Sequence, residues 1–272
     1  MCVFEYIYEK HCPRGFYKNM AKQLTEREKV QFHQDGFLIV PALFNKDEML
    51  QLLQIAKSDR AILEDAYAKK DAAGNESKLA VRNELDHSPY AAIVRSKRVA
   101  GNMEFLLQDE VYHYHHKMML KEPKVGGAWE WHQDYGYWYN NGCLYPDMAS
   151  CMLAVDQATQ ANGCLQVIRG SHHMGRIEHG KTGDQTGADL QRVEVALQRL
   201  ELVFCELNPG DAVFFHSNTL HRSDRNGSEH PRWSLICCYN TRHNDPFLPS
   251  KHPNYHPLEI WDEQRVRAFL GI

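Results

Sequence analysis

Short segments that favour β-strands follow one another through the second half of the chain, from about Glu110 onward. Each is rich in β-branched and aromatic residues, and Gly, Pro and Asn punctuate the sequence between them. Seven or more short strands separated by such turns are typical of a sandwich or jelly roll, in which two sheets bury a shared core. The expected strands are 111–120, 129–135, 150–155, 165–168, 202–207, 212–216 and 233–239.

Helix signals dominate the first part of the chain. Thr25 and Glu28 form a capping box for a helix that Gly36 ends, and the apolar residues 37–40 follow as a strand. Asn45 is expected to cap a second helix that runs from about residue 46 towards residue 69. The side chains expected on its buried side are Met49, Leu50, Leu53, Ile55, Ala56 and Ile62.

Three further segments complete the expected secondary structure. Residues 70–84 are polar and read as a loop, whereas residues 94–108 are expected to form another helix. Residues 175–189 are rich in glycine and charge and are expected to be a mobile loop. We expect one mainly β domain with flanking α-helices over residues 1–272, with a helical part at about 24–108 and a jelly-roll core at about 110–242.

Composition excludes several functional classes. The formal charge of −4 and the pI near 6.5 argue against a nucleic-acid-binding or polybasic membrane surface. Eight cysteines without a CxxC pair fit reduced thiols. No apolar run approaches the roughly 20 residues of a membrane span, and residues 1–22 lack an apolar signal core. Because residues 270–272 are not a peroxisomal address either, we expect a cytoplasmic protein.

The pattern His132-Gln133-Asp134, with His221 much later in the chain, is a candidate metal site. Two histidines and one carboxylate are the ligands of non-haem Fe(II) oxygenases, which leave coordination positions open for a cosubstrate and O₂. Side chains at i and i+2 of a strand share a face, so His132 and Asp134 are expected to reach one ion while Gln133 points away. A jelly roll can bring His221 to the same place from another strand.

Two neighbouring groups of residues have competing interpretations. His113, His115 and His116 form a rival metal site, but no carboxylate lies nearby in matching register, and packing or substrate-pocket lining is favoured. The aromatic residues that follow the candidate ligands can either wall a substrate pocket or pack in the core. They are Tyr135, Tyr137, Trp138 and Tyr139.

Several blocks of sequence resemble the phytanoyl-CoA dioxygenase family when they are taken together and in order. The blocks are Phe32-His33-Gln34-Asp35-Gly36-Phe37 with Val40-Pro41, Trp131-His132-Gln133-Asp134, Asn162-Gly163-Cys164-Leu165 leading to Gly170-Ser171-His172, the run from Leu207 to Phe215, and His221-Arg222-Ser223 with Arg232 eleven positions after His221. The resemblance covers roughly residues 24–242. It implies a double-stranded β-helix, the cupin-like form of the jelly roll, and a requirement for Fe(II), 2-oxoglutarate and O₂, with ascorbate as a supporting reductant.

The resemblance also implies roles for individual residues. His132, Asp134 and His221 match the iron ligands, and Arg232 matches the arginine that binds the distal carboxylate of 2-oxoglutarate. A planar guanidinium can bind a carboxylate bidentately, and a cation inside a barrel needs an anionic partner. The further residues that fall at the cosubstrate pocket are Ser234, Ser223, Gln133 and Met118, with Lys117 or Lys121 as an additional candidate.

The resemblance implies a dioxygenase that hydroxylates a small molecule and releases succinate and CO₂. Related iron halogenases replace the carboxylate ligand with a small residue, so Asp134 favours hydroxylation. The alternative is a catalytically inactive jelly-roll protein that binds a ligand or metal, but such a protein would be expected to lose a ligand or the arginine. A small polar or secondary metabolite is preferred over an acyl-CoA as substrate, and the oligomeric state is left open.

Overall fold

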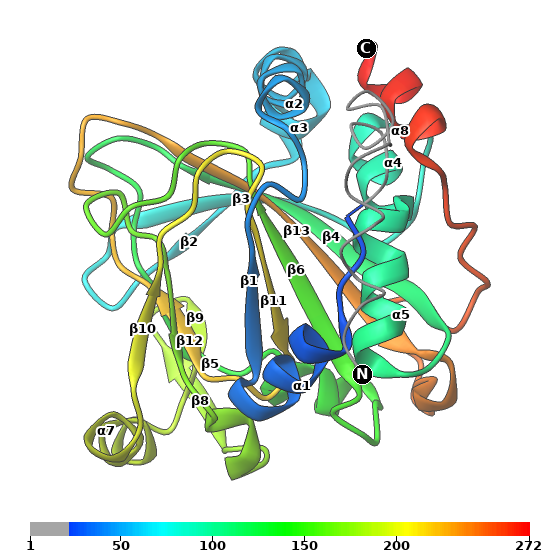
Figure 1. The fold of residues 1–272 in the computed structure, drawn as a ribbon. Helices are drawn as coiled ribbons and strands as arrows, with labels where there is room; N and C mark the ends of the chain where they lie inside the picture. The colour runs from blue at the N-terminus through cyan, green and yellow to red at the C-terminus, as the bar shows by residue number, and fades with distance from the viewer. Residues whose placement is uncertain (1–21) are drawn as a thin grey trace, which may run out of the picture.

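Two antiparallel sheets face each other in the computed structural model, which describes residues 22–272 (Figure 1). The larger sheet has the order β1-β11-β6-β13-β4-β3-β2 and the smaller one the order β10-β7-β12-β5. This arrangement is the jelly roll, or double-stranded β-helix, that the strand pattern and the family resemblance predict. The strands are β1 (Phe37–Val40), β2 (Tyr67–Lys70), β3 (Glu76–Arg82), β4 (Val111–Lys121), β5 (Trp129–His132), β6 (Met148–Ala154), β7 (Leu165–Ile168), β8 (His179–Thr182), β9 (Gln185–Ala188), β10 (Leu202–Cys205), β11 (Ala212–His216), β12 (His221–Ser223) and β13 (Arg232–Thr241).

Helices cover the outer faces of both sheets. Figure 1 shows α4, α5 and α8 along the larger sheet and α7 beside the smaller one. The helices are α1 (Glu26–Asp35), α2 (Lys46–Ser58), α3 (Arg60–Asp65), α4 (Pro89–Arg95), α5 (Asn102–Leu107), α6 (Tyr135–Trp138), α7 (Leu190–Arg199) and α8 (Glu263–Leu270), with a π-helical turn at Lys97–Gly101 and 3₁₀ turns at Tyr139–Asn141, Ser171–Met174 and Arg242–Asn244.

Alternation along the strands creates separate hydrophobic cores. On β4, Met118 packs in the core between the larger sheet and the helices, whereas Met119 packs in the core between the two sheets. Leu235 and Ile236 of β13 divide in the same way. A third core, which includes Trp131 and Val193, lies between the smaller sheet and α7. The inner core therefore surrounds whatever polar groups the strands direct between the sheets.

The predicted helices exist, but two of them are shorter than expected. The capping box of Thr25 and Glu28 and the left-handed Gly36 bound α1 as predicted. The second helix ends at Ser58, because the Asp59 carboxylate accepts hydrogen bonds from backbone N–H groups of a new helix, α3. Leu50, expected inside, is 54% exposed.

The helix expected over residues 94–108 is interrupted at Ser96, whose backbone is extended with ψ 142°. Its hydroxyl accepts a hydrogen bond from Val99 N–H and caps the π-helical turn that follows. Of the side chains on the buried face of this segment, Val99, Met103 and Leu106 are completely buried.

Two segments expected to be loops form β-hairpins instead. Within residues 70–84, β3 pairs with both β2 and β4 and so extends the larger sheet. Within residues 175–189, β8 and β9 pair through a turn at Gly183, which has φ +59°. Both segments read as loops because one face of each hairpin is exposed, so apolar side chains are few and the period-two signal is weak.

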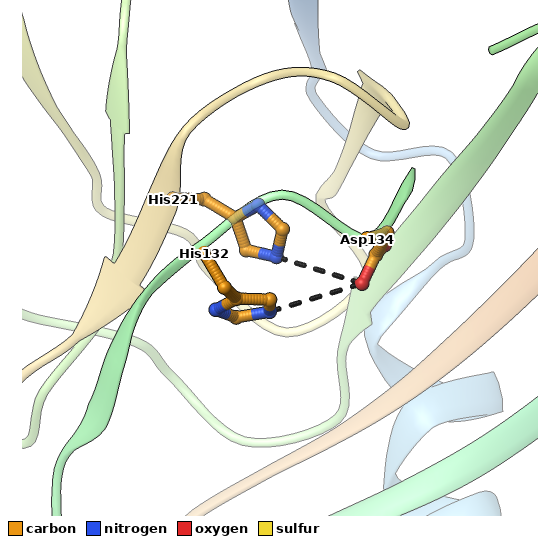
Figure 2. Close-up of side chains that lie close together, drawn as sticks. All are labelled: His132, Asp134 and His221. Atoms are coloured by element: carbon orange, nitrogen blue, oxygen red, sulfur yellow. Dashed lines mark ion pairs between the residues drawn. The ribbon is translucent and has the colours of Figure 1, made fainter. Parts of the chain in front are cut away.

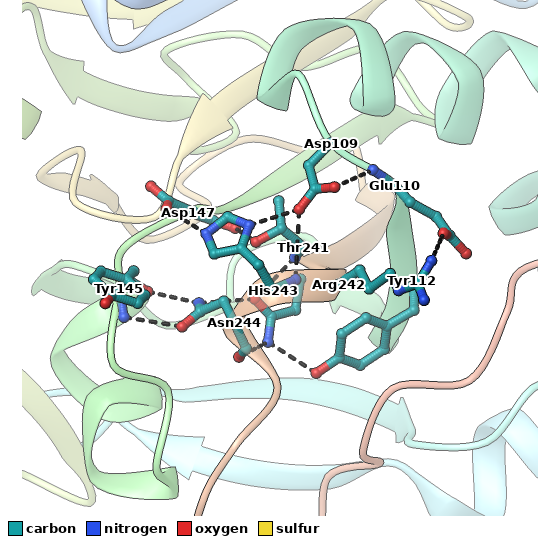
Figure 3. A network of polar contacts seen from close by, with 10 residues as sticks. Asp109, Glu110, Tyr112, Tyr145, Asp147, Thr241, Arg242, His243 and Asn244 are labelled. Atoms are coloured by element: carbon teal, nitrogen blue, oxygen red, sulfur yellow. Dashed lines mark hydrogen bonds and ion pairs between the residues drawn. The ribbon is translucent and has the colours of Figure 1, made fainter.

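A polar network joins three strand ends of the larger sheet (Figure 3). His243, just after β13, contacts Asp109 at 2.6 Å through Nδ1 and Asp147 at 2.8 Å through Nε2. The hydrogen bond to Asp109, together with Asp147, raises the pKa of His243. Asn244 adds hydrogen bonds to the backbone of Tyr145. The network fixes the end of β13 relative to the segments that precede β4 and β6.

No helix within residues 22–272 combines the length and the apolar character needed to cross a membrane. The six cysteines in that range are buried and form no disulfide with one another, as the absence of a paired spacing predicts. Residues 1–22 are expected to contain no signal core. Of these residues the structure describes only Lys22, so this expectation lies outside the described residues.

Gly36→Ala is expected to lower the free energy of unfolding by about 3 kcal/mol or more. A left-handed non-glycine residue costs about 1–2 kcal/mol, and the added methyl would also overlap His172 Nδ1 and lie 2.8 Å from Thr219 Oγ1. Gly74→Ala is the matched control, because Gly74 has φ +86° but open space around it. Urea denaturation measures both; equal losses would contradict the packing argument.

Candidate metal and cosubstrate site

Two histidines meet across a strand pair of the smaller sheet. His132 on β5 and His221 on β12 are direct partners in the antiparallel register, and their ring centroids are 4.0 Å apart. His132 Nδ1 donates to the carbonyl of Glu130 at 2.7 Å, and His221 Nδ1 donates to the carbonyl of Thr219 at 2.9 Å. These bonds fix each tautomer, so both Nε2 lone pairs are available to a ligand.

Asp134 completes the group from a turn and not from the strand (Figure 2). β5 ends at His132, and Asp134 has helical backbone angles, φ −57° and ψ −41°, at the start of α6. Its Oδ1 lies 3.8 Å from His132 Nε2 and 3.9 Å from His221 Nε2. The prediction that the two residues share a strand face was wrong in its geometry, although they do converge.

The larger sheet holds the other carboxylate oxygen of Asp134. Ser150 on β6 donates its hydroxyl to Asp134 Oδ2 at 2.9 Å. Oδ1 is therefore left directed at the two imidazoles, and the ligand atoms of all three residues lie within 4.8 Å of one another. That spacing is close to that of ligands around one ion with bonds of about 2.0–2.2 Å.

Burial keeps both imidazoles in the form that binds metal. The pKa of His132 is held well below its usual range by burial and then by the charge of His221. Burial also lowers the pKa of His221, with Asp134 opposing the shift. Neutral imidazoles beside a carboxylate are the donor set for a divalent ion such as Fe(II). The residues therefore fit the metal that the family resemblance implies.

A cavity between the two sheets opens directly onto this group. It is lined by Lys117, Met119, Trp129, His132, Asp134, Met152, Leu165, Phe215, His221, Arg222, Ser223, Arg232 and Ile236. For the part of the chain that the structure describes, Asp134 is the only carboxylate among the lining side chains. The remaining lining is chiefly apolar and aromatic, as is usual for small-molecule sites with a few placed polar groups.

Arg232 is a buried cation in this cavity without an anionic partner among residues 22–272. Its Nη1 donates to Ser234 Oγ at 3.3 Å, and its Nε has no hydrogen-bond partner. Burial lowers the pKa of Arg232 to about 10. A buried guanidinium left unpaired is costly, so the arrangement fits a carboxylate ligand that supplies the missing charge. The structure thus places Arg232 and Ser234 together, as the resemblance implies.

Lys121 and Ser223 form a second polar pair beside Arg232. Lys121 is opposite Arg232 in the register of β4 and β13 and donates to Ser223 Oγ at 2.9 Å and to the carbonyl of Asp224. Burial, followed by the charge of Arg232, holds the pKa of Lys121 well below its usual range. Both candidate lysines face inward, but only Lys117 lines the cavity itself.

Two residues expected at the cosubstrate pocket lie elsewhere. Met118 points to the opposite face of β4, into the core under the helices, because strand alternation directs Lys117 and Met119 inward instead. Gln133 is buried, but its amide donates to the carbonyls of Gly175 and Asn218 and accepts from Ile177 N–H. Its side chain fastens the loop before β8 and does not line the cavity.

The rival histidines do not form a metal site. His113 Nε2 and His116 Nδ1 are 3.0 Å apart and face the helices, whereas His115 stands apart beside Trp138. Within residues 22–272, His132, Asp134 and His221 are the only three His, Cys, Asp or Glu side chains grouped closely enough to hold one ion.

The aromatic residues after Asp134 pack and do not wall the cavity. Tyr137 lies 5.5 Å from the His132 ring, and its hydroxyl donates to the carbonyl of Thr186. Trp138 packs against Tyr114, and Tyr139 is 48% exposed.

Several lining residues are not among those predicted from the sequence. Trp129 and Phe215 supply the aromatic wall, and Ser150 orients Asp134. The alternation of side chains between the two faces of a strand could have predicted that Met119 on β4 and Ile236 on β13 point into the cavity. No sequence pattern marks Ser150, because its role depends on the packing of one sheet on the other.

Comparisons with known proteins match both the sequence and the fold of this chain. The sequence profile of the phytanoyl-CoA dioxygenase (PhyH) family matches residues 32–234. The L-proline trans-4-hydroxylase of Streptomyces griseoviridis is 30% identical, over 83% of this chain and 90% of its own length. The ectoine dioxygenase of Stutzerimonas stutzeri is 27% identical, over 90% and 88%. The crystal structure of EctD from S. alaskensis with bound Fe has a TM-score of 0.72 at 23% identity, covering 88% of this chain and 87% of that chain.

Ser150→Ala is expected to weaken divalent-metal binding by roughly tenfold or more, because it frees the Asp134 carboxylate to rotate. Calorimetric titration with Mn(II) measures the affinity. Ser217→Ala is the matched control: it removes a buried hydroxyl that donates to the carbonyl of Pro146, and it keeps the Ser217 carbonyl that accepts from Tyr135 N–H. Equal affinities for the two variants would show that Ser150 does not position Asp134.

Proposed function

The chain belongs to the phytanoyl-CoA dioxygenase family, and from that membership we propose how its own residues perform the reaction. The protein is an Fe(II)- and 2-oxoglutarate-dependent dioxygenase that hydroxylates a small molecule and releases succinate and CO₂. The observation that carries the assignment of residues is the buried His-Asp-His group facing a cavity that also contains an unpaired arginine.

His132, Asp134 and His221 are the iron ligands in this proposal. When bound, the iron and 2-oxoglutarate supply the activation of O₂ that the protein's own side chains lack. The backbone carbonyls of Glu130 and Thr219 hold the two imidazoles, so that Nε2 of each faces the cavity. All three ligands are almost completely buried, which excludes bulk water from the reaction.

Arg232 binds the distal carboxylate of 2-oxoglutarate, and Ser234 and Ser223 assist it. The missing partner of the buried guanidinium supports this role. Lys121 fixes the hydroxyl of Ser223 and adds positive charge behind Arg232. Met118 and Gln133 take no direct part, because neither side chain reaches the cavity.

The retained ligands and arginine favour the enzyme over an inactive jelly-roll binding protein. The named relatives act on L-proline and ectoine, which supports a small polar substrate for this chain. We further propose that the chain acts as a single dioxygenase domain in the cytoplasm and has no nucleic-acid or membrane partner, as the net charge of −4 suggests.

Purified protein is expected to form succinate from 2-oxoglutarate when supplied with Fe(II), ascorbate and O₂. His132→Ala is expected to reduce succinate formation to background while leaving the melting temperature largely unchanged, because it removes an iron ligand. His87→Ala, at an exposed histidine, is the control. Folded protein that neither binds 2-oxoglutarate nor forms succinate would refute the proposed function, and full activity of His132→Ala would refute the ligand assignment.

Arg232→Met is expected to weaken 2-oxoglutarate binding by roughly 10- to 100-fold, since a charged hydrogen-bonded contact contributes about 1.5–3 kcal/mol. The unliganded variant should be at least as stable as the wild type, because the substitution removes a buried charge that has no anionic partner. Anaerobic calorimetry and urea denaturation give the two numbers. The exposed Arg225→Met serves as control. Lost stability with unchanged affinity would assign Arg232 a purely structural role.

A further inference from the structure

Among residues 22–272, Lys117 is the one cavity-lining cation that has neither a side-chain partner nor a role in the proposed cosubstrate site. Three basic side chains line the cavity: Lys117, Arg222 and Arg232. Arg222 is already engaged, because its Nε donates to Gln166 Oε1 at 2.9 Å and its Nη2 lies 3.4 Å from Asp224. Arg232 is assigned to 2-oxoglutarate. The half-buried Lys117 forms no hydrogen bond or ion pair with any residue in the range 22–272.

Position along the sheet separates Lys117 from Arg232, and so from the distal carboxylate of the cosubstrate that Arg232 binds in the proposed function. In the register of β4 and β13, Lys121 is opposite Arg232, whereas Lys117 is opposite Ile236. Four residues of strand correspond to about 13 Å. Extended 2-oxoglutarate measures about 7 Å between its outermost carboxylate oxygens, from four C–C bonds of about 1.5 Å and two C–O bonds of about 1.2 Å. The apolar Met119 lies between the two lysines on the same face. The cavity therefore has two cationic ends with an apolar middle.

Charge balance leaves Lys117 without a counterion even in the loaded site. Arg222 pairs with Asp224, and Lys121 does not line the cavity. Of the remaining charges, the two of Fe(II) and the one of Arg232 are balanced by Asp134 and the two carboxylates of 2-oxoglutarate. Within residues 22–272, no other acidic side chain lines the cavity. Lys117 is also close to the metal ligands: after burial, its charge is among the causes that lower the pKa of His132 and His221. An unbalanced cation beside the reacting centre calls for an anionic group on the remaining ligand.

We propose that Lys117 binds a carboxylate of the substrate, so that this enzyme oxidises small carboxylic acids such as free amino acids and their cyclic derivatives. The inference rests on the proposed function, since it concerns the space left when iron and 2-oxoglutarate are bound. Trp129 and Phe215 would then contact the apolar part of the substrate beside the three ligands. A neutral substrate would leave the ammonium of Lys117 desolvated without compensation.

A panel of matched acids and amides tests the substrate class. L-proline and other free amino acids, each paired with its carboxamide, are added to the wild-type enzyme, and stimulation of succinate formation and hydroxylated product are measured. We expect at least one acid to stimulate turnover and its amide to have at least a tenfold lower kcat/KM. Amides that match their acids, or a panel in which no acid is active, would overturn the proposal. Succinate formed without any added substrate reports the proposed function separately.

Variants of Lys117 distinguish substrate binding from cosubstrate binding. Lys117→Met is expected to raise KM for the active acid at least tenfold, and Lys117→Arg to restore part of the loss. The affinity for 2-oxoglutarate, measured anaerobically by calorimetry, should change less than threefold. Lys78→Met, at an exposed lysine on the neighbouring strand β3, is the control and should match the wild type. A tenfold loss of 2-oxoglutarate affinity in Lys117→Met, or an unchanged KM, would overturn the proposal.

Discussion

The antiparallel pairing of β12 with β5 is the constraint on which the rest of the site depends. It sets His221 directly opposite His132, although 88 residues separate them along the chain. β12 is paired on its other side with β7, where His221 is opposite Val167, so the strand has little freedom to shift. A slip of one residue would turn every side chain of β12 to the other face and remove His221 from the cavity.

The larger sheet contributes cationic side chains and a hydroxyl to the site, whereas the smaller sheet contributes the two histidines. Ser150 of β6 holds one oxygen of Asp134, and β4 and β13 bring Lys117, Lys121 and Arg232 to the same inner face. Buried cations without anionic partners oppose folding, and the hydrophobic core around them must offset that cost. Such a cluster is understandable as a site that receives its negative charge from ligands, with Arg232 and Lys117 four residues apart in the register of β13 and β4.

Local sequence signals predicted those parts of the fold that depend on interactions between residues close together in the chain. The capping box at Thr25 and the left-handed Gly36 define α1, and dense β-branched and aromatic runs became strands. Errors arose where a tertiary contact overrode the local pattern. The polar segment 70–84 becomes strand because β4 offers it hydrogen-bonding partners, and Asp134 leaves the strand to begin α6. Met118 was misplaced because a family position does not by itself give the face of a strand.

The sequence by itself determined the residues that we propose carry the chemistry: two histidines, a carboxylate and an arginine, in blocks whose order marks the family. The identities of these residues are set by the covalent chain and do not change when it folds. Only the tertiary structure decided which side chains converge and which charges stay unpaired. Burial, strand register and the packing of the two sheets left Arg232 without an anionic partner in residues 22–272, directed Lys117 into the cavity of the proposed metal ligands and turned Gln133 away. Each of these depends on contacts between segments far apart in the chain, for which a single sequence contains no local signal.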